Sequence, residues 1–594
     1  MKNRAIVLFL CFVAGFNAVA QSLQEGKSHF YAQRYQLASN VFQQLLKTNP
    51  TDVEALYWGG QAALSLELDS AKKPAVVRAW FDKAVQLNSS APLLMIGAGQ
   101  ADLFENKIND ARQKFESALT MTRTKKGESV SILTAILQVN TTSPNHDLLY
   151  FIDKAKLQLE NEKAEKSAEL YLVVGDAIRK AKPGEGGGEA FRNYQEALKL
   201  NPTYALASYR LARLFDSQKN WELVFQYLNE CVQKDPSFTP AYYELFYYFF
   251  YRRDYSSAEQ QLQKYISTKA PEKDIQDEFL YSQLCWARSD FNCAISKAES
   301  VLSALGENNK PRVFRLLSDA YYQAGDTLKK QANEDGAKGA FANAKKYSDR
   351  FFSKAGDEND AIILYDYQLR ADILEKTGGT PEEISGTYLQ STRVDTLATL
   401  KVDLLKKGAD RFKARGDSLS RVLEGVLRTE VIKVKPTPSQ RDYFDAGFAF
   451  YQGKDYTHAD SLFTIYVNKY PEEMYGYMML YNIQRAVDTS MEMGTAVPWA
   501  IKYLEILEKD TVKNKKTIIG VAGYLAAYSA NILKDKEKAL QYLRRMLALD
   551  PTNAAIQQNI SVLEKSAANK PEPPKTEGAS NNQAAKPSGV PGNT

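Results

Sequence analysis

The sequence predicts an all-α fold in which helical hairpins stack one after another. Two observations lead to this prediction. Three consecutive blocks, residues 190–202, 224–236 and 258–271, begin at intervals of 34 residues, and each ends in proline. Two antiparallel helices with their turns fill such a period, whereas patterns that alternate between apolar and polar residues, typical of strands, are missing from the chain.

Composition limits the classes of function. The 594 residues contain 44% hydrophobic and 25% charged residues, and 76 basic and 71 acidic side chains leave a net charge of +5. Such a balance creates no strong field for a polyanion, so no nucleic acid partner is expected. The three histidines are not paired at ligand spacing, so we expect neither a metal site nor another cofactor.

The N-terminus has the pattern of a secretory signal peptide over residues 1–20. Positive charge at Lys2 and Arg4 precedes an apolar run over residues 5–16, and small residues follow at 18–20. We therefore expect an exported protein, periplasmic or alternatively at the cell surface or secreted. The remaining chain has no apolar stretch of about 20 residues, so no integral membrane segment is expected after cleavage. Cys11 lies inside the apolar run, which disfavours a lipid anchor.

The repeats combine small residues on both helices with aromatic residues on the second. Gly447 and Ala459 would let two helix backbones approach, while Phe463 and Tyr466 would fill the gap to the next hairpin. Pro471 then ends the second helix. The same arrangement occurs near the N-terminus, between residues 26 and 50, and again between residues 527 and 551.

These residues resemble the tetratricopeptide repeat family over most of residues 22–565. The resemblance implies an α-solenoid, a right-handed superhelix of helical hairpins. Residues 128–170 and 355–435 match the pattern poorly and are predicted to be degenerate repeats. Insertions are expected at residues 66–74, 182–188, 327–338 and 488–497.

Two changes in composition predict boundaries. Pro436 and Pro438 exclude a helix over residues 435–439, so we expect an N-terminal array over residues 21–435 and a smaller C-terminal block over residues 439–565. Residues 566–594 are rich in proline, glycine and asparagine and nearly lack large apolar side chains. This tail is predicted to be disordered.

Motifs for catalysis are weak. The glycine-rich residues 182–188 follow no strand and precede no Gly-Lys-Ser/Thr, so a loop is predicted there and not a phosphate site. The tripeptide at residues 415–417 is interpreted as a turn. Neither a Ser-His-Asp nor a Cys-His arrangement has support in the sequence, and we do not expect an enzyme.

Three cysteines remain after signal removal, namely Cys231, Cys285 and Cys293. Cys285 is expected on the first helix and Cys293 near the start of the second helix of one hairpin, so the turn would bring them together. A disulfide requires a Cα separation of about 4.4–6.8 Å. The alternative is that both cysteines are buried as small apolar side chains.

The aromatic residues form the one compositional excess that suggests a binding surface. Residues 242–251 place aromatic side chains on every face of one helix, more than packing requires. In the family that the chain resembles, the first helix of each hairpin lines a concave groove, so the surplus is expected there. The alternative is that helix packing absorbs all of these rings. The predicted groove residues come from four consecutive hairpins and are Tyr209, Arg213, Tyr243, Tyr247, Tyr251, Phe279, Gln283, Trp286, Arg315, Asp319 and Tyr322.

The leading functional hypothesis is an exported, non-enzymatic scaffold that binds a protein or peptide partner in this groove, within a cell-envelope assembly. A second hypothesis is a glycan-binding component of an outer-surface nutrient-uptake system, which the aromatic surplus favours and the missing lipid-anchor cysteine disfavours. A hydrolase in a degenerate segment is the remote alternative.

Overall fold

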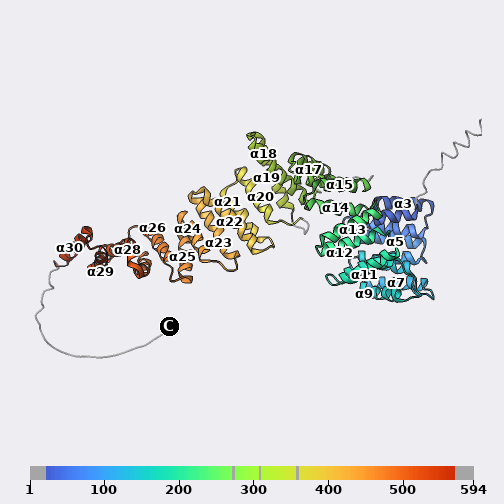
Figure 1. Cartoon of the computed structure of the whole chain (residues 1–594), viewed down its shortest axis with the longest axis horizontal. Helices are drawn as coiled ribbons and strands as arrows, with labels where there is room; N and C mark the ends of the chain where they lie inside the picture. The colour runs from blue at the N-terminus through green and yellow to red at the C-terminus, as the bar shows by residue number, and fades with distance from the viewer. Residues whose placement is uncertain (1–21, 270–273, 307–308, 356–359, 569–594) are drawn as a thin grey trace, which may run out of the picture. The chain divides into compact units, whose positions relative to one another are not determined.

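The computed structural model describes residues 22–269, 274–306, 309–355 and 360–568. Within these ranges the regular structure is helical, and β-type pairing is confined to one isolated bridge between Thr124 and Gly127. Successive helices pack against each other as hairpins (Figure 1), which confirms the predicted all-α fold. The predicted signal peptide at residues 1–20 lies outside the described residues.

The chain divides into two compact units, Met1–Thr327 and Leu328–Thr594, with the division inside helix α18. The first unit contains the helices up to α18. They are α2 (Leu23–Tyr31), α3 (Tyr35–Thr48), α4 (Val53–Leu66), α5 (Lys73–Leu87), α6 (Pro92–Phe104), α7 (Ile108–Thr122), α8 (Val130–Thr142), α9 (Leu148–Glu160), α10 (Ala168–Ala181), α11 (Gly187–Leu200), α12 (Ala205–Ser217), α13 (Trp221–Lys234), α14 (Thr239–Tyr251), α15 (Tyr255–Lys269), α16 (Gln276–Ala287), α17 (Phe291–Leu305) and α18 (Pro311–Lys330).

The second unit continues with the same kind of helix pairs and includes two short 3₁₀ turns, η2 and η3. Its elements are α19 (Glu334–Lys354), α20 (Leu364–Lys376), α21 (Pro381–Gln390), η2 (Ser391–Arg393), α22 (Ala398–Arg415), α23 (Ser418–Val434), α24 (Gln440–Gln452), α25 (Tyr456–Lys469), α26 (Met474–Val487), α27 (Val497–Leu507), η3 (Glu508–Asp510), α28 (Thr511–Asn531), α29 (Lys536–Leu549) and α30 (Ala554–Ala568). None of the helices in the described part of the chain combines the length and the hydrophobicity that crossing a bilayer requires.

A recurring tight turn joins the two helices of many hairpins. Between α14 and α15, Arg253 adopts a positive φ of 62°, and the backbone N–H of Asp254 donates to the carbonyl of Phe249 at 3.1 Å. The Asp254 carboxylate then accepts from the N–H of Ser257 and so caps α15. Ser289 has the same conformation between α16 and α17. Polar residues at these turns therefore set the point where each second helix begins.

Glycines allow a close approach between neighbouring helices. A Cβ atom added at Gly97 would lie 2.1 Å from the ring of Phe81, and one added at Gly447 would lie 2.8 Å from the ring of Phe463. Each of these aromatic rings is fully buried. The small residue and the ring therefore form one packing unit. Phe463 packs on Gly447 of its own hairpin, whereas the sequence predicted that its ring fills the gap to the next hairpin.

The segments that match the repeat pattern poorly are helical. Residues 128–170 contain α8 and α9, and residues 355–435 contain α20 to α23. Of the expected insertions, residues 66–74 lie mainly between α4 and α5, and residues 488–497 lie between α26 and α27. Residues 327–338 lie mainly at the ends of two helices, because α18 extends to Lys330 and α19 begins at Glu334. The extra residues there lengthen two helices and form no long loop.

The proline-containing segment at residues 435–439 separates α23 from α24 without separating their packing. Ser439 caps α24, and a Cβ added at Gly425 of α23 would lie 2.8 Å from the ring of Phe450 on α24. The compact units divide at residue 327 and not at this linker, so a boundary between repeat blocks at 435–439 stays a prediction. At the C-terminus, α30 extends to Ala568, three residues into the predicted tail, and residues 569–594 lie outside the described residues.

The first hairpin of unit 1 returns to contact helices that follow much later in the chain. Ala32, in the turn between α2 and α3, is 1% exposed and belongs to the hydrophobic core that α10 to α14 form. Arg34 Nη2 donates to Ser237 Oγ at 3.2 Å, across 203 residues of sequence. In Figure 1 the blue helices near the N-terminus accordingly lie beside the green helices around α13. The superhelix of unit 1 thus closes on itself through contacts of its N-terminal hairpin with α10 to α14.

The structure joins Cys285 and Cys293 by a disulfide, with their Cα atoms 5.7 Å apart. The bond links α16 to α17 across one tight turn. Cys231 is a buried free cysteine, and burial raises the pKa of its thiol well above the usual value. It should therefore react slowly in the folded protein.

The contact between Gly97 and Phe81 predicts a position-specific loss of stability. Gly97→Ala should lower the free energy of unfolding by about 1–3 kcal/mol, because the new methyl group forces the buried ring to move. Gly188→Ala, in α11 of the same unit, is the matched control, because no atom lies within 4 Å of its added Cβ. Chemical denaturation of both variants measures the difference. Equal stabilities would contradict the close-approach model.

The disulfide predicts the thiol count of the mature chain. Unreduced protein without residues 1–20 should show one thiol after denaturation, that of Cys231, and three thiols after reduction. Titration with a thiol reagent gives these counts, and native protein should react slowly. Three reactive thiols in the unreduced, denatured chain would show that Cys285 and Cys293 are not bonded.

Candidate binding groove

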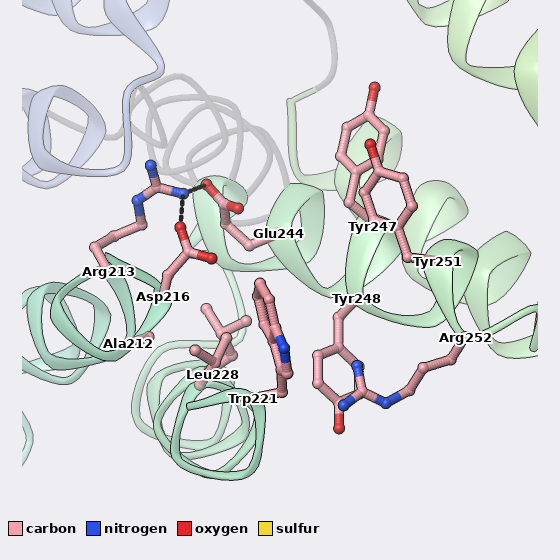
Figure 2. A pocket seen from close by; sticks show the side chains of 11 residues that line it. Ala212, Arg213, Asp216, Trp221, Leu228, Glu244, Tyr247, Tyr248, Tyr251 and Arg252 are labelled. Atoms are coloured by element: carbon pink, nitrogen blue, oxygen red, sulfur yellow. Dashed lines mark hydrogen bonds and ion pairs between the residues drawn. The ribbon is translucent and has the colours of Figure 1, made fainter. Parts of the chain in front are cut away.

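Two cavities lie on either side of α14 in unit 1. The first, here called the Trp221 cavity, has a volume of about 520 Å³ and is formed by α12, α13 and α14 (Figure 2). The second, here called the Lys269 cavity, has a volume of about 580 Å³ and lies between α14 and the helices α15 and α16. Glu244 and Tyr247 line both cavities, so the two adjoin and form one groove.

The Trp221 cavity has an apolar floor. Ala212 of α12 and Val224 and Leu228 of α13 are buried there. Trp221 is the first residue of α13 and is 45% exposed. Figure 2 shows its indole standing between Leu228 and Tyr248. A large apolar ring that lines a cavity and remains accessible to solvent offers a contact for an incoming ligand.

Tyrosines on α14 form the wall of the Trp221 cavity. Tyr247 and Tyr251 are four residues apart and share a helix face, so their rings stack with centroids 5.9 Å apart. Tyr251 is 77% exposed. On the adjacent face, the Arg252 guanidinium lies 3.8 Å from the centroid of the Tyr248 ring. This cation–π contact holds the arginine at the edge of the cavity.

A charged cluster lies opposite these rings. Arg213 Nη1 is 2.7 Å from Glu244 Oε1 and 3.4 Å from Asp216 Oδ2 (Figure 2). The Tyr209 hydroxyl donates to the same Glu244 oxygen at 3.4 Å. Burial raises the pKa of Glu244, and the nearby Arg213 opposes this effect. Glu244 is thus a partly desolvated carboxylate at the junction of the two cavities.

The Lys269 cavity is also lined by aromatic and charged side chains. Tyr243 is 36% exposed, and its ring lies 5.4 Å from that of Tyr265 on α15. Lys269 Nζ lies 3.0 Å from Asp277 Oδ1 of α16. The Tyr247 hydroxyl donates to Gln283 Oε1 at 3.1 Å and connects α14 with α16.

The structure brings together part of the predicted groove set. Seven residues line one or both cavities: Tyr209, Arg213, Tyr243, Tyr247, Tyr251, Phe279 and Gln283. Tyr209 and Phe279 are nevertheless buried and contribute mainly to packing. Four residues line neither cavity: Trp286, Arg315, Asp319 and Tyr322. The predicted strip over four hairpins is therefore shorter than expected, because the predicted residues of α18 line neither cavity, although Arg312 at the start of α18 lines the Lys269 cavity.

Sequence reasoning missed Trp221, Tyr248, Arg252 and Glu244. It considered only first helices, whereas Trp221 begins a second helix directly after the capping residue Asn220. Glu244 and Tyr248 lie within the aromatic run on α14 and Arg252 follows directly after it, but the prediction followed only the face that carries Tyr243, Tyr247 and Tyr251. An aromatic residue just after a turn was the signal that could have identified Trp221.

Comparison with known families identifies repeats in the first hairpins. Residues 23–92 match the family described as tetratricopeptide repeat. This range comprises α2 to α5 and the first residue of α6. The first hairpins of the chain, over residues 23–92, are therefore similar to tetratricopeptide repeats.

Solved structures with similarity to the chain include further repeat proteins. The C-terminal part of a TPR repeat-containing protein from Cytophaga hutchinsonii is 24% identical and covers 48% of this chain and 99% of its own, with a TM-score of 0.25. A tetratricopeptide repeat protein from Parabacteroides merdae is 17% identical and covers 44% of this chain and 92% of its own, with a TM-score of 0.33. PilW, a type IV pilus biogenesis factor, is 14% identical and covers 40% of this chain and 99% of its own, with a TM-score of 0.31. No curated protein sequence matches this chain.

The raised pKa of Glu244 predicts a pH-dependent difference in stability. The folded state binds a proton at this carboxyl more tightly than the unfolded chain, whose pKa is near 4.5. The wild type should therefore gain stability relative to Glu244→Gln as the pH falls from 7 through the raised native pKa. Denaturation of both proteins between neutral and acidic pH measures this difference. A difference that shifts in the opposite direction would show that Arg213 outweighs burial.

Proposed function

We propose that this tetratricopeptide-repeat protein is an exported, non-enzymatic scaffold that holds an extended segment of a protein partner in the groove around α14. Binding of other proteins is the usual role of such repeats. The observation that carries the proposal is the pair of adjoining cavities that share Glu244 and Tyr247. Two cavities in a row suit a chain that places successive side chains into them.

The exposed rings supply the contact area for this partner. Trp221 and Tyr251 in the first cavity and Tyr243 in the second all remain accessible. Tyrosine and tryptophan are enriched among interface residues that dominate binding, because they bury large areas at a low cost in rotamer entropy. The groove therefore favours a segment with large apolar side chains.

The charged side chains beside the rings favour a partner that carries both positively and negatively charged groups. Arg252 and Lys269 offer cationic groups, while Asp216 and Glu244 offer carboxylates. Such a mixture can fix the register of a peptide but does not attract a polyanion. This supports a protein segment over a nucleic acid as the ligand.

Export is supported by two independent features. The sequence of residues 1–20 has the charge, apolar run and small residues of a signal peptide. The disulfide between Cys285 and Cys293 belongs to an oxidising compartment. We place the partner in the cell envelope for this reason, in the periplasm or at the cell surface.

Substitution of the exposed rings tests the groove. Trp221→Ala combined with Tyr251→Ala should lower the melting temperature only modestly, because Trp221 is about half exposed and Tyr251 is largely exposed. The probes are peptides that the wild-type protein selects from a displayed library of random sequences. The double variant should bind these peptides at least about tenfold more weakly than the wild type, because the loss of each aromatic contact costs about 1–2 kcal/mol of binding free energy.

Trp286→Ala is the matched control. Trp286 is 37% exposed in the same unit but lines neither cavity, so its loss should not change binding of the selected peptides. Equal losses in the control and the double variant would argue against a groove around α14. Unchanged binding in both would reject it.

A further inference from the structure

A second pair of cavities lies in unit 1, formed mainly by helices that precede α14 in the chain. The first, here called the Gln61 chamber, has a volume of about 350 Å³. The second, here called the Tyr57 chamber, has a volume of about 370 Å³. Helices α2, α4, α6, α8 and α10 contribute to both, and Tyr31 and Gln138 line both. The two chambers therefore adjoin, and each lies near the lower end of the size range of small-molecule sites.

The Tyr57 chamber contains buried hydroxyl groups without partners. Tyr57 is 1% exposed, and its hydroxyl has no hydrogen-bond partner among the described residues. Thr134 Oγ1, on α8, is likewise buried and unpartnered within those residues. A buried polar group left unpaired costs about 1–3 kcal/mol. Two such hydroxyl groups among the residues that line one cavity leave hydrogen-bonding capacity that a bound ligand would satisfy.

The other polar groups of the chambers are mostly neutral. Ser129, Ser131 and Gln138 line the Tyr57 chamber from the side of α8. In the Gln61 chamber, Gln61 Nε2 donates to Gln100 Oε1 at 2.7 Å, an amide pair between α4 and α6. Amides and hydroxyls both donate and accept hydrogen bonds, so they match a ligand whose own groups do both.

Aromatic rings stand beside these polar groups. Tyr31 lines both chambers, Trp58 lines the Tyr57 chamber, and Phe104 lines the Gln61 chamber. Flat rings next to hydroxyls and amides suit a ligand with apolar C–H faces and a rim of hydroxyl groups. Sugar rings have this chemistry.

The charges of the chambers nearly cancel. Three basic side chains (Lys27, Lys73, Arg210) and four acidic ones (Glu54, Glu165, Glu169, Asp176) line them. Lys27 pairs with Glu54 at 2.7 Å, and Arg210 pairs with Asp176 at 2.8 Å. These walls do not favour a polyanion. The small volume of each chamber favours a short ligand over a long chain.

We propose that the two chambers bind a neutral oligosaccharide of about two to four sugar units. The hydroxyls of Tyr57 and Thr134 pair with sugar hydroxyls, Gln138 contacts the ligand where the chambers meet, and Trp58 and Tyr31 pack against its C–H faces. Gln33 lines both the Gln61 chamber and the Lys269 cavity, so this site adjoins the proposed peptide groove. The residues proposed to hold the sugar are different from those proposed to hold the peptide, and the site supplies a second binding activity of unit 1.

Isothermal titration calorimetry of the full mature chain tests the proposal. The probes are gluco-, galacto-, manno- and xylo-oligosaccharides of about two to four units at millimolar concentration. At least one should bind. Tyr57→Phe should weaken its binding by about 3–10-fold, the usual effect of one neutral hydrogen bond, while the melting temperature stays equal or rises. Gln138→Leu should weaken binding further.

The controls separate this site from the groove around α14. Trp221→Ala should not change binding of the oligosaccharide, and Tyr57→Phe should not change binding of library-selected peptides. The proposal is overturned if no probe binds, or if the affinity of a bound probe is unchanged in Tyr57→Phe and Gln138→Leu. It also fails if Tyr57→Phe lowers the melting temperature, since the hydroxyl then serves the fold alone, or if selected peptides displace the sugar.

Discussion

The close packing of an aromatic ring against a glycine on the neighbouring helix is the contact on which the rest of this architecture depends. Where Phe81 meets Gly97, the ring lies against the backbone of α6 in the space that a side chain at residue 97 would occupy. The spacing between successive hairpins fixes the curvature of the array. In unit 1 that curvature brings the turn after α2 against the core of α10 to α14, and the two chambers lie among the helices between them.

Helix geometry decides which aromatic residues pack and which remain available for binding. On α14, Phe246 is fully buried in the core, whereas Tyr251, five residues later, is largely exposed. Tyr247 lies between these extremes and both packs and lines the groove. One face of α14 thus packs in the core, and another face lines the candidate groove. The many aromatic residues of this helix are therefore divided between packing and the candidate site.

The sequence was sufficient to predict the helical hairpins, because their period and small residues are local features that repeat. It could not indicate that the array closes, since the contact between Arg34 and Ser237 joins residues without any shared pattern. The groove was predicted in part. The positions of Tyr247 and Tyr251 in the groove could be predicted from helical spacing. The position of Trp221 depends on where a second helix begins, and the position of Trp286 outside the cavities depends on the rotation of α16 about its axis, neither of which the spacing shows.

Closure of unit 1 also changes how the molecule should fold. In an open solenoid each repeat contacts only its neighbours, so contact order is low and stability is a sum of local contributions. A contact that spans 203 residues adds a long loop whose closure entropy must be overcome before the ring forms. The first hairpin is then expected to pack against α10 to α14 late in folding. Unit 1 should unfold in one cooperative transition and not one repeat at a time.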